Sequence, residues 1–305
     1  MTGLTGFLFG LNRRLLMFSS DSKAVLGIGQ CATLACFLEA TAPKPGNVHR
    51  GTDFDDLTYP DLITSAIMIG PVMESAPRRR LGETILDAVR ATHDAVETNT
   101  NLGTILLLAP LAAVPRKQPL DSGVRDVLDR LDAEDSRLVY EAIRMARPGG
   151  MGRVDQADVA GEAPADLIAA MRLAAERDLV ARQYVNGFYV VFHDVVPAIQ
   201  SGLDRGWGTS GAIVHAQMTI MSRFPDSLVA RKCGKETAQR ASDHAAEVLR
   251  SGTPNDDAFW QAVADLDFWL RADGHRRNPG TTADLIAAGL FALLRDGIMG
   301  GGRRK

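Results

Sequence analysis

Residues 281–294, TTADLIAAGLFALL, decide the fold class that we predict for this chain. From Leu285 onward the segment is apolar, and its large side chains recur three and four positions apart, as they do on one face of a helix. Thr281 followed by Asp284 has the spacing of a hydroxyl N-cap and a carboxylate three residues later. The stretch therefore predicts an apolar helix that begins near Thr281.

The same helical spacing occurs along most of the chain, whereas clear strand alternation is missing. Aromatic residues make up only 6% of the sequence and β-branched runs are few, so a sandwich or barrel would have too little strand-forming sequence. We predict an all-α fold, a single large multi-helix bundle whose active site is formed by inter-helix loops. The further segments with helical spacing are 24–41, 60–74, 83–96, 165–180, 210–222 and 257–270.

A length of 305 residues allows one large helical domain or two ordinary ones. We predict a helical domain over 21–297, preceded by an N-terminal extension (1–20) and followed by a flexible tail (298–305). The glycine-rich stretch 147–164 is interpreted as a mobile connection or lid, or as a division between two subdomains.

Composition places the chain among ordinary folded proteins. Hydrophobic residues make up 46% and charged residues 23%, which excludes a disordered chain and a collagen-like fibre. A net charge of −3 gives no electrostatic reason to expect nucleic acid or an anionic membrane as a partner. No apolar run reaches the roughly 18 to 20 residues of a membrane span, and the three cysteines have no disulfide or metal spacing. We expect a cytoplasmic protein, and its apolar helical surface favours a homodimer.

The loop 42–57, APKPGNVHRGTDFDDL, combines cations and carboxylates with a sharply turned backbone. Lysine and arginine neutralise phosphate oxygens, whereas aspartate oxygens suit Mg²⁺. A solvated surface turn with internal ion pairs explains the same composition equally well. The candidate residues of this loop are Lys44, Gly46, His49, Arg50 and Asp53.

Two further loops carry polar groups next to helix ends. Asn99, Thr100 and Asn101 come directly before the apolar segment TILLLAPLAAV, and a helix N-terminus favours anions. The alternative is a helix cap with nothing bound. In the loop 224–235, Asp226 lies near Arg231 and Lys232, which indicates a second phosphate contact or an ordinary surface turn.

The loop 272–281 leads into the helix quoted first. Gly280, Thr282 and Asp284 bring a flexible backbone, a hydroxyl and a carboxylate to one place. Such a set suits a phosphate or a metal ion, although Asp284 has an alternative role as a helix cap. The P-loop, the Rossmann glycine fingerprint, the zinc helix His-Glu-x-x-His and the Gly-x-Ser-x-Gly elbow are all missing from the sequence.

Four short motifs in order resemble the triphosphoribosyl-dephospho-coenzyme A synthase family, over about residues 24–295. They are Pro43-Lys44-Pro45-Gly46, Asn99-Thr100-Asn101-Leu102-Gly103, Pro225-Asp226-Ser227-Leu228 running to Arg231, and Pro279-Gly280-Thr281-Thr282-Ala283-Asp284-Leu285.

The resemblance implies an all-helical transferase that joins ATP to 3'-dephospho-coenzyme A, releases adenine and makes the precursor of a prosthetic group. The 2'-hydroxyl of the acceptor would attack C1' of the ATP ribose, which requires charge stabilisation, a carboxylate and help for the leaving base. By this analogy Lys44, Arg231 and Lys232 would hold phosphates, and Asn99 and Asn101 would position ribose or phosphate. The catalytic candidates are Asp226 and Asp284, and the candidate Mg²⁺ ligands are Asp53, Asp226 and Asp284.

The chain departs from the family pattern in two places. Asn101 and Leu102 stand where the family has His-Lys, and His49 stands where the citrate lyase branch has Asp. These changes indicate a divergent branch of the family. Three alternatives to transfer to dephospho-coenzyme A stay open: ATP-dependent ribosyl transfer to another coenzyme acceptor, hydrolysis of the N-glycosidic bond with water in place of the acceptor, and a helical protein that binds nucleotide without turnover.

Overall fold

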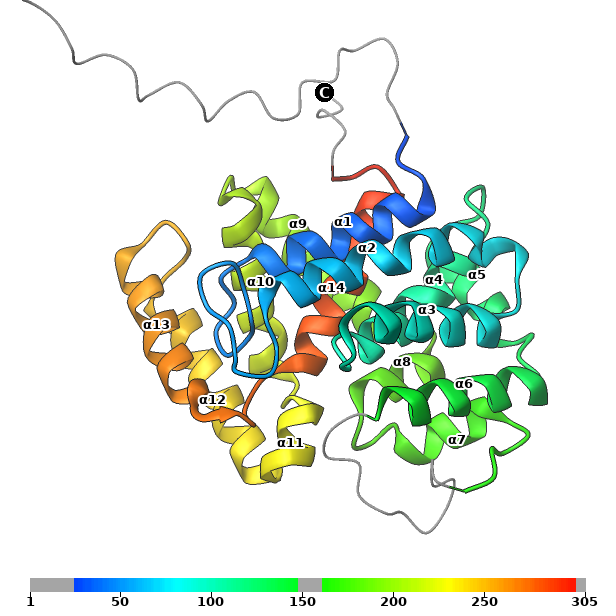
Figure 1. Ribbon diagram of the computed structural model, residues 1–305. Coiled ribbons are helices and arrows are strands. Elements are labelled where there is room, and N and C mark those ends of the chain that lie inside the picture. Colours follow the sequence, from blue (N-terminus) through cyan, green and yellow to red (C-terminus); the bar gives the residue numbers. More distant parts are fainter. Residues whose placement is uncertain (1–24, 148–160, 300–305) are drawn as a thin grey trace, which may run out of the picture.

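The computed structural model describes residues 25–147 and 161–299, and in this part of the chain it is helical almost throughout, as predicted (Figure 1). The predicted extension 1–20, most of 147–164 and nearly all of the tail 298–305 lie outside the described residues. The first half contains α1 (Ile28–Thr41), α2 (Tyr59–Ser75), a 3-10 turn (Ala76–Arg78), α3 (Leu81–Val96), α4 (Leu102–Ala113), α5 (Leu120–Leu128) and α6 (Ala133–Ala146).

The second half begins with short helices. It contains α7 (Leu167–Ala174), α8 (Leu179–Asn186), a π-helical turn (Val191–Val195), α9 (Val196–Asp204), α10 (Gly208–Arg223), α11 (Ser227–Cys233), α12 (Lys235–Ser251), α13 (Asp257–Arg271), the short extended segment β1 (Ala272–His275) and α14 (Gly280–Arg295). Its long helices are α10, α12, α13 and α14. No helix in the described ranges is both long and apolar enough to cross a membrane.

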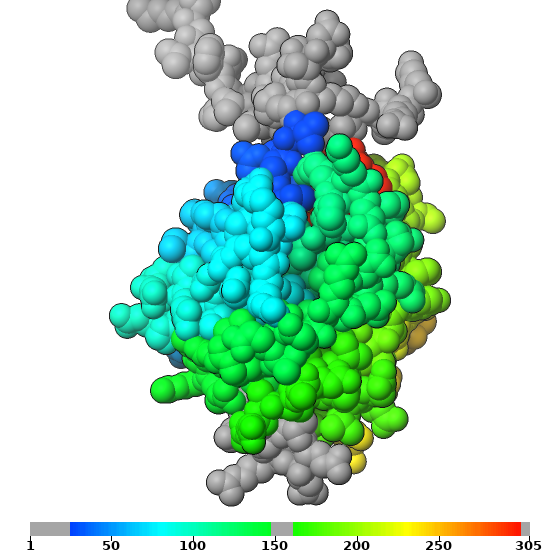
Figure 2. Space-filling view, turned by 90° about the vertical axis from the view of Figure 1, so that its right-hand side faces the viewer, coloured from blue at the N-terminus to red at the C-terminus, as the bar shows by residue number. Residues whose placement is uncertain are grey.

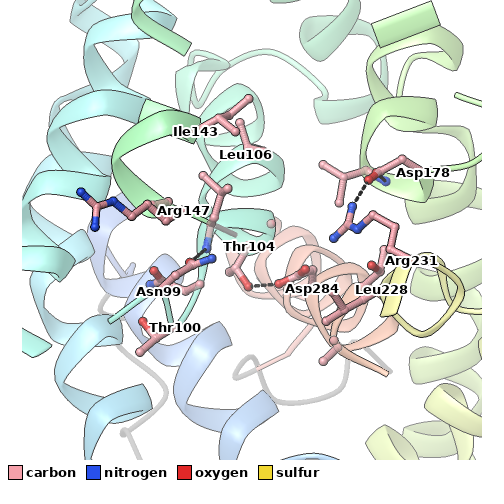
Figure 3. Close-up of a pocket in the computed structure, with 18 of the residues that line it drawn as sticks. Asn99, Thr100, Thr104, Leu106, Ile143, Arg147, Asp178, Leu228, Arg231 and Asp284 are labelled. Carbon is pink, nitrogen blue, oxygen red and sulfur yellow. Dashed lines mark hydrogen bonds and ion pairs between the residues drawn. The ribbon is translucent and has the colours of Figure 1, made fainter. Parts of the chain in front are cut away.

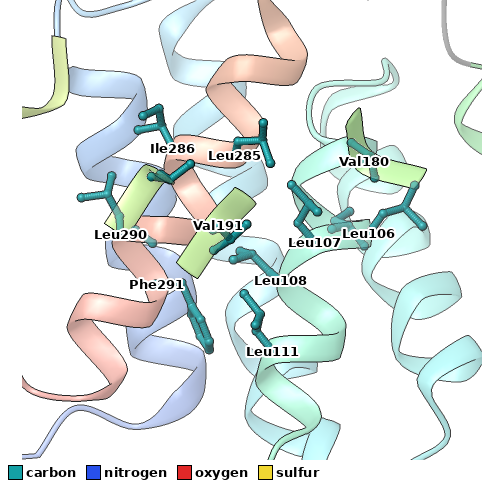
Figure 4. Close-up of a cluster of buried hydrophobic side chains, with 14 of the residues drawn as sticks. Leu106, Leu107, Leu108, Leu111, Val180, Val191, Leu285, Ile286, Leu290 and Phe291 are labelled. Carbon is teal, nitrogen blue, oxygen red and sulfur yellow. The ribbon is translucent and has the colours of Figure 1, made fainter. Parts of the chain in front are cut away.

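The quoted apolar segment forms α14, which packs against α1, α4 and α10 in the middle of the bundle (Figure 1). Its apolar side chains are buried on every side of the helix, which is typical of a core helix. The equally apolar α4 lies beside it, and Figure 4 shows Leu107, Leu108 and Leu111 of α4 facing the same cluster as Leu290 and Phe291 of α14. These two helices form the rigid centre that positions the loops at their N-terminal ends.

Two sequence expectations about helix boundaries are wrong. The segment 165–180 is not one helix, because α7 ends at Ala174 and Asp178 starts α8 by accepting hydrogen bonds from the backbone N–H groups of Val180 and Ala181. Thr281 does not cap α14, which begins at Gly280, and the Asp284 side chain is hydrogen-bonded to another helix. The carboxylate is therefore available for a different role.

A buried polar network joins the loop after α1 to the start of α14. Asn47 donates to the side-chain oxygen of Asn278 (2.6 Å) and accepts a hydrogen bond from Gln217 of α10 (2.8 Å). Gly46 has a positive φ of 75°, and its N–H donates to Asp267 of α13. Glycine suits this position both because of that φ and because an added Cβ would lie 2.7 Å from Leu270. The network fixes two motif loops side by side.

Candidate functional site

A cavity of about 770 Å³ opens at the N-terminal ends of α4 and α14. Its walls come from α4, α6, α7, α8 and α11 and from the loops that precede α2, α4 and α14. In Figure 2 the cyan residues of the first third of the chain lie directly against the green residues of α6–α8 on this face of the molecule. Because both helix N-termini face the cavity, their dipoles favour an anionic ligand.

Asp284 lies at the centre of the cavity, against the first turn of α4 (Figure 3). Its Oδ1 accepts a hydrogen bond from the Thr104 hydroxyl at 2.6 Å. Its Oδ2 lies so close to α4 that a Cβ on Gly103 would be 2.0 Å away, which explains why glycine stands there. Burial raises the pKa of Asp284 to about 8, the Thr104 hydrogen bond lowers it, and the nearby carboxylates of Glu39, Asp226 and Asp178 raise it further.

The loop before α4 forms one side of the cavity. Asn99 accepts a hydrogen bond from the Leu102 N–H through its Oδ1 (3.1 Å) and so caps the first turn of α4. The Thr100 hydroxyl pairs with Ser65 of α2 at 2.6 Å. Asn101 lines the cavity and makes no side-chain cap to the helix that it precedes. The first two residues therefore shape the loop, whereas Asn101 faces the cavity with its amide unused by the helix.

On the opposite side, Arg231 and Lys232 of α11 line the cavity. Arg231 is paired with Asp178 at the start of α8, with 2.5 Å between Nη1 and Oδ2, and the pair is visible in Figure 3. The Lys232 ammonium has no hydrogen bond or ion pair within the described ranges, and partial burial lowers its pKa. A half-buried cation with no partner is well suited to bind an anionic group.

The remaining wall is apolar on one side and cationic at its edge. Leu106 of α4 and Ile143 of α6 face this region together in Figure 3, and the rest of the apolar wall comes from Met145, Leu167, Ala170, Met171 and Ala174. Arg147 and Arg177 also line the cavity. The cavity thus offers a cationic and polar region and an apolar region to one ligand.

Asp226 is placed elsewhere than we predicted, since it does not line this cavity. Its side chain is only 1% exposed, and its two carboxylate oxygens accept four hydrogen bonds. Leu228 N–H and Val229 N–H donate to Oδ1, whereas the N–H and hydroxyl of Thr282 donate to Oδ2. Asp226 therefore joins the first turn of α11 to that of α14, and Thr282 is its buried partner.

The predicted residues of the loop 42–57 also lie outside the cavity lining. Lys44 is fully buried in an ion pair with Glu39 instead of facing a ligand. Asp53 accepts a hydrogen bond from the Tyr59 N–H and so holds the start of α2. His49 accepts one from the Gly51 N–H within its own turn, and burial with the nearby Arg271 and Lys44 charges lowers its pKa. Gly46 shapes the turn and Arg50 is exposed.

The structure thus brings together some of the predicted site residues and leaves others apart. Those that line the cavity are Asn99, Thr100, Asn101, Arg231, Lys232, Gly280 and Asp284. Within the described part of the chain, no three His, Cys, Asp or Glu side chains come together as a metal-binding group, so Asp53, Asp226 and Asp284 do not form a joint metal site.

Several cavity residues were missed by the sequence analysis. Glu39 is the one charged residue in the α1 sequence IGQCATLACFLEAT, and Thr104 is a hydroxyl in an otherwise apolar helix. A polar residue that interrupts an apolar helix is a usable signal, because it needs a partner or a function once it is buried. Asp178 and Arg177 gave no such signal, because they lie in a segment that we interpreted as a continuous helix.

Comparisons with known proteins agree with this architecture. The family model described as ATP:dephospho-CoA triphosphoribosyl transferase matches residues 26–301. A similar solved structure is that of a protein from Archaeoglobus fulgidus described as a proposed triphosphoribosyl-dephospho-coA synthase, with 27% identity and a TM-score of 0.60. The match covers 79% of this chain and 99% of that one. The search of curated proteins gives no match.

Proposed function

The chain belongs to the ATP:dephospho-CoA triphosphoribosyl transferase family and is a transferase of this class, and we propose that it moves the 5'-triphosphoribosyl group of ATP to 3'-dephospho-CoA with release of adenine. The observation that carries this proposal is the position of Asp284. Its carboxyl group has a raised pKa and lines a cavity that also contains cationic and apolar side chains. A carboxyl group that keeps its proton in such a cavity is suited to assist the loss of a base from a nucleotide.

The cationic region would take the triphosphate. Arg231, Lys232, Arg147 and Arg177 line the cavity, and the N-termini of α4 and α14 add backbone N–H groups and favourable dipoles. The Lys232 ammonium has no partner in the described ranges and can bind a phosphate directly, whereas Arg231 shares its charge with Asp178 and Arg147 lies on the other side of Asp284 in Figure 3. The apolar wall of α6 and α7 would then take the adenine or the pantetheine arm of the acceptor.

Asp284 would assist the departure of adenine. With a pKa of about 8, the side chain holds a proton at neutral pH, so it can donate that proton to a ring nitrogen as the bond between C1' and N9 breaks. The acceptor oxygen forms the new bond to C1' and gives up its own proton. General acid assistance of this kind contributes about 10²- to 10⁴-fold to a rate.

Mg²⁺ would enter with the triphosphate as Mg-ATP. Of the three carboxylates that we predicted as ligands, only Asp284 lines the cavity, and Asp226 has both oxygens saturated by hydrogen bonds. The side chains present do not fit a cage that holds the ion by itself, whereas Mg²⁺ commonly binds through substrate phosphates and water.

The test is adenine release from Mg-ATP, followed by chromatography and mass spectrometry, with and without dephospho-CoA. We expect adenine and triphosphoribosyl-dephospho-CoA in equal amounts. Adenine with free ribose triphosphate in the absence of an acceptor would identify a hydrolase instead. Release that requires an added mixture of other coenzymes would identify a different acceptor. ATP binding without adenine under every condition would contradict the proposed transfer.

A further inference from the structure

Glu39 is a second carboxylate of the cavity, contributed by the last turn of α1. Its side chain is 16% exposed, and it is one of the groups whose negative charge raises the pKa of Asp284. Cys36, one turn earlier on α1, is also affected by the Asp284 charge. Glu39 and Asp284 therefore line one cavity, on two helices that pack together, and are close enough for their charges to interact.

Lys44 is the partner of this carboxylate and is completely buried. Its Nζ lies 2.8 Å from Glu39 Oε1 and donates to the Glu39 carbonyl oxygen at 2.5 Å. The same ammonium thus binds the Glu39 side chain and the carbonyl of that residue near the end of α1, where helix carbonyls lack internal partners. Two contacts to one residue fix both the backbone and the side chain of Glu39.

The second oxygen of Glu39 has no such partner. Over residues 25–147 and 161–299, no hydrogen bond is made to Oε2, although the residue lines the cavity. One oxygen is thus used to orient the carboxylate, and the other remains available to a ligand. This division is typical of a positioned base, whose orientation is set by a neighbour that does not itself touch the substrate.

We propose that Glu39 is the base that accepts the proton of the attacking acceptor hydroxyl, and that Lys44 is the positioning residue that holds Glu39 in place. This inference rests on the proposed transfer. In the step, the acceptor O–H bond breaks and its proton passes to Glu39, while the new bond from oxygen to C1' forms. The C1'–N9 bond breaks with its electron pair on adenine, which takes the proton of Asp284. Transfer of the Glu39 proton to Asp284, directly or through water, restores both groups.

The assignment differs from the phosphate contact that the sequence suggested for Lys44. If Lys44 turned into the cavity, the Glu39 carboxylate and carbonyl would lose their partner, and an unpaired buried charge is strongly destabilising. Lys232, which has no partner in the described ranges and lines the cavity, meets no such cost when it binds phosphate. The two lysines therefore have separable effects on turnover and on ATP binding.

The experiment measures kcat and the KM of ATP for wild-type protein, Glu39→Gln, Lys44→Met, the double variant and Lys232→Met as the matched control. We expect Glu39→Gln and Lys44→Met each to lower kcat by about 100-fold or more with less than about threefold change in KM. The double variant should be no slower than Glu39→Gln alone, because both changes remove one unit. Lys232→Met should raise the KM of ATP. When Lys232→Met is combined with Glu39→Gln, the fold-changes in kcat/KM of the two single variants should multiply.

Other outcomes would overturn the inference. Wild-type kcat in Glu39→Gln would exclude the base, and a raised KM at unchanged kcat in Lys44→Met would make this lysine a phosphate ligand. If Lys44→Met does not fold, Glu39→Gln and the double variant, which removes both members of the ion pair, still decide the question. Wild-type protein that releases no adenine would overturn the proposed transfer and this inference together, whereas active wild-type with active Glu39→Gln overturns the inference alone.

Discussion

Asp226 and Asp284 began as equivalent candidates, and the structure gives them opposite surroundings. Asp226 accepts four hydrogen bonds and is outside the cavity lining. Asp284 accepts one hydrogen bond in the described part of the chain and lines the cavity. Desolvation raises the pKa of both groups, but Asp226 has several hydrogen bonds that lower it again. The number of hydrogen bonds on a buried carboxylate, more than its burial, distinguishes one whose oxygens are all used within the fold from one that can still interact with a ligand.

The largest expected effect is on turnover at Asp284. In Asp284→Asn the amide keeps an oxygen for the Thr104 hydroxyl but cannot donate a proton to adenine at a useful rate. We expect adenine release to fall by about 10³-fold, with folding unchanged by circular dichroism. A variant that kept more than a tenth of wild-type turnover would contradict the proposed difference between Asp284 and Asp226.

Next comes the stability effect at Asp226. Asp226→Ala leaves the buried N–H groups of Leu228, Val229 and Thr282 without their acceptor, so we expect the free energy of unfolding to fall by about 3 to 4 kcal/mol. Urea denaturation measures the change. A variant of unchanged stability that has lost adenine release would return Asp226 to the list of catalytic candidates.

The smallest expected effect is a change in the pH dependence of stability at Asp284. Between about pH 4 and pH 8 the folded protein keeps a proton on Asp284 that the unfolded chain has lost, so this group's contribution to stability falls as the pH rises through that window. The Asp284→Asn variant has no carboxyl group at this position, so its free energy of unfolding does not show this decrease with pH. We therefore expect the variant to gain about 3 kcal/mol relative to wild type between pH 5.5 and pH 8.5, because the extra proton is kept over roughly 2.5 of these pH units at about 1.4 kcal/mol per unit.

Urea denaturation of both proteins at these two pH values checks the prediction. The charged or titratable groups that act on Asp284 from the neighbouring elements are Glu39 and Cys36 of α1, Asp178 before α8 and Asp226 before α11, with Lys44 and Arg231 paired to two of them. They are present in both wild type and variant, so the difference reports only the titration that depends on Asp284. A difference that stays constant with pH would show that Asp284 holds no proton in the folded protein.

Helix positions were predictable where local spacing decides them. The core helices α4 and α14 follow from apolar runs, and α2 begins with a capping box formed by Thr58 and Asp61, which are three residues apart. The break between α7 and α8 was not predictable in this way, because the apolar spacing continues through it while Asp178 starts a new helix. Asp178 then pairs with Arg231, which is far away in sequence.

The sequence by itself determined the all-helical fold, the family and the loops that hold the chemistry, because periodicity, caps and short motifs are local properties of the chain. Only the tertiary structure decided which polar residues face the cavity. Lys44 and Asp226 lie in motifs as distinctive as that of Asp284, yet their charges are used by Glu39 and by the starts of α11 and α14. The role of a buried charged side chain depends on the partners that packing brings next to it, and those partners come from distant parts of the chain.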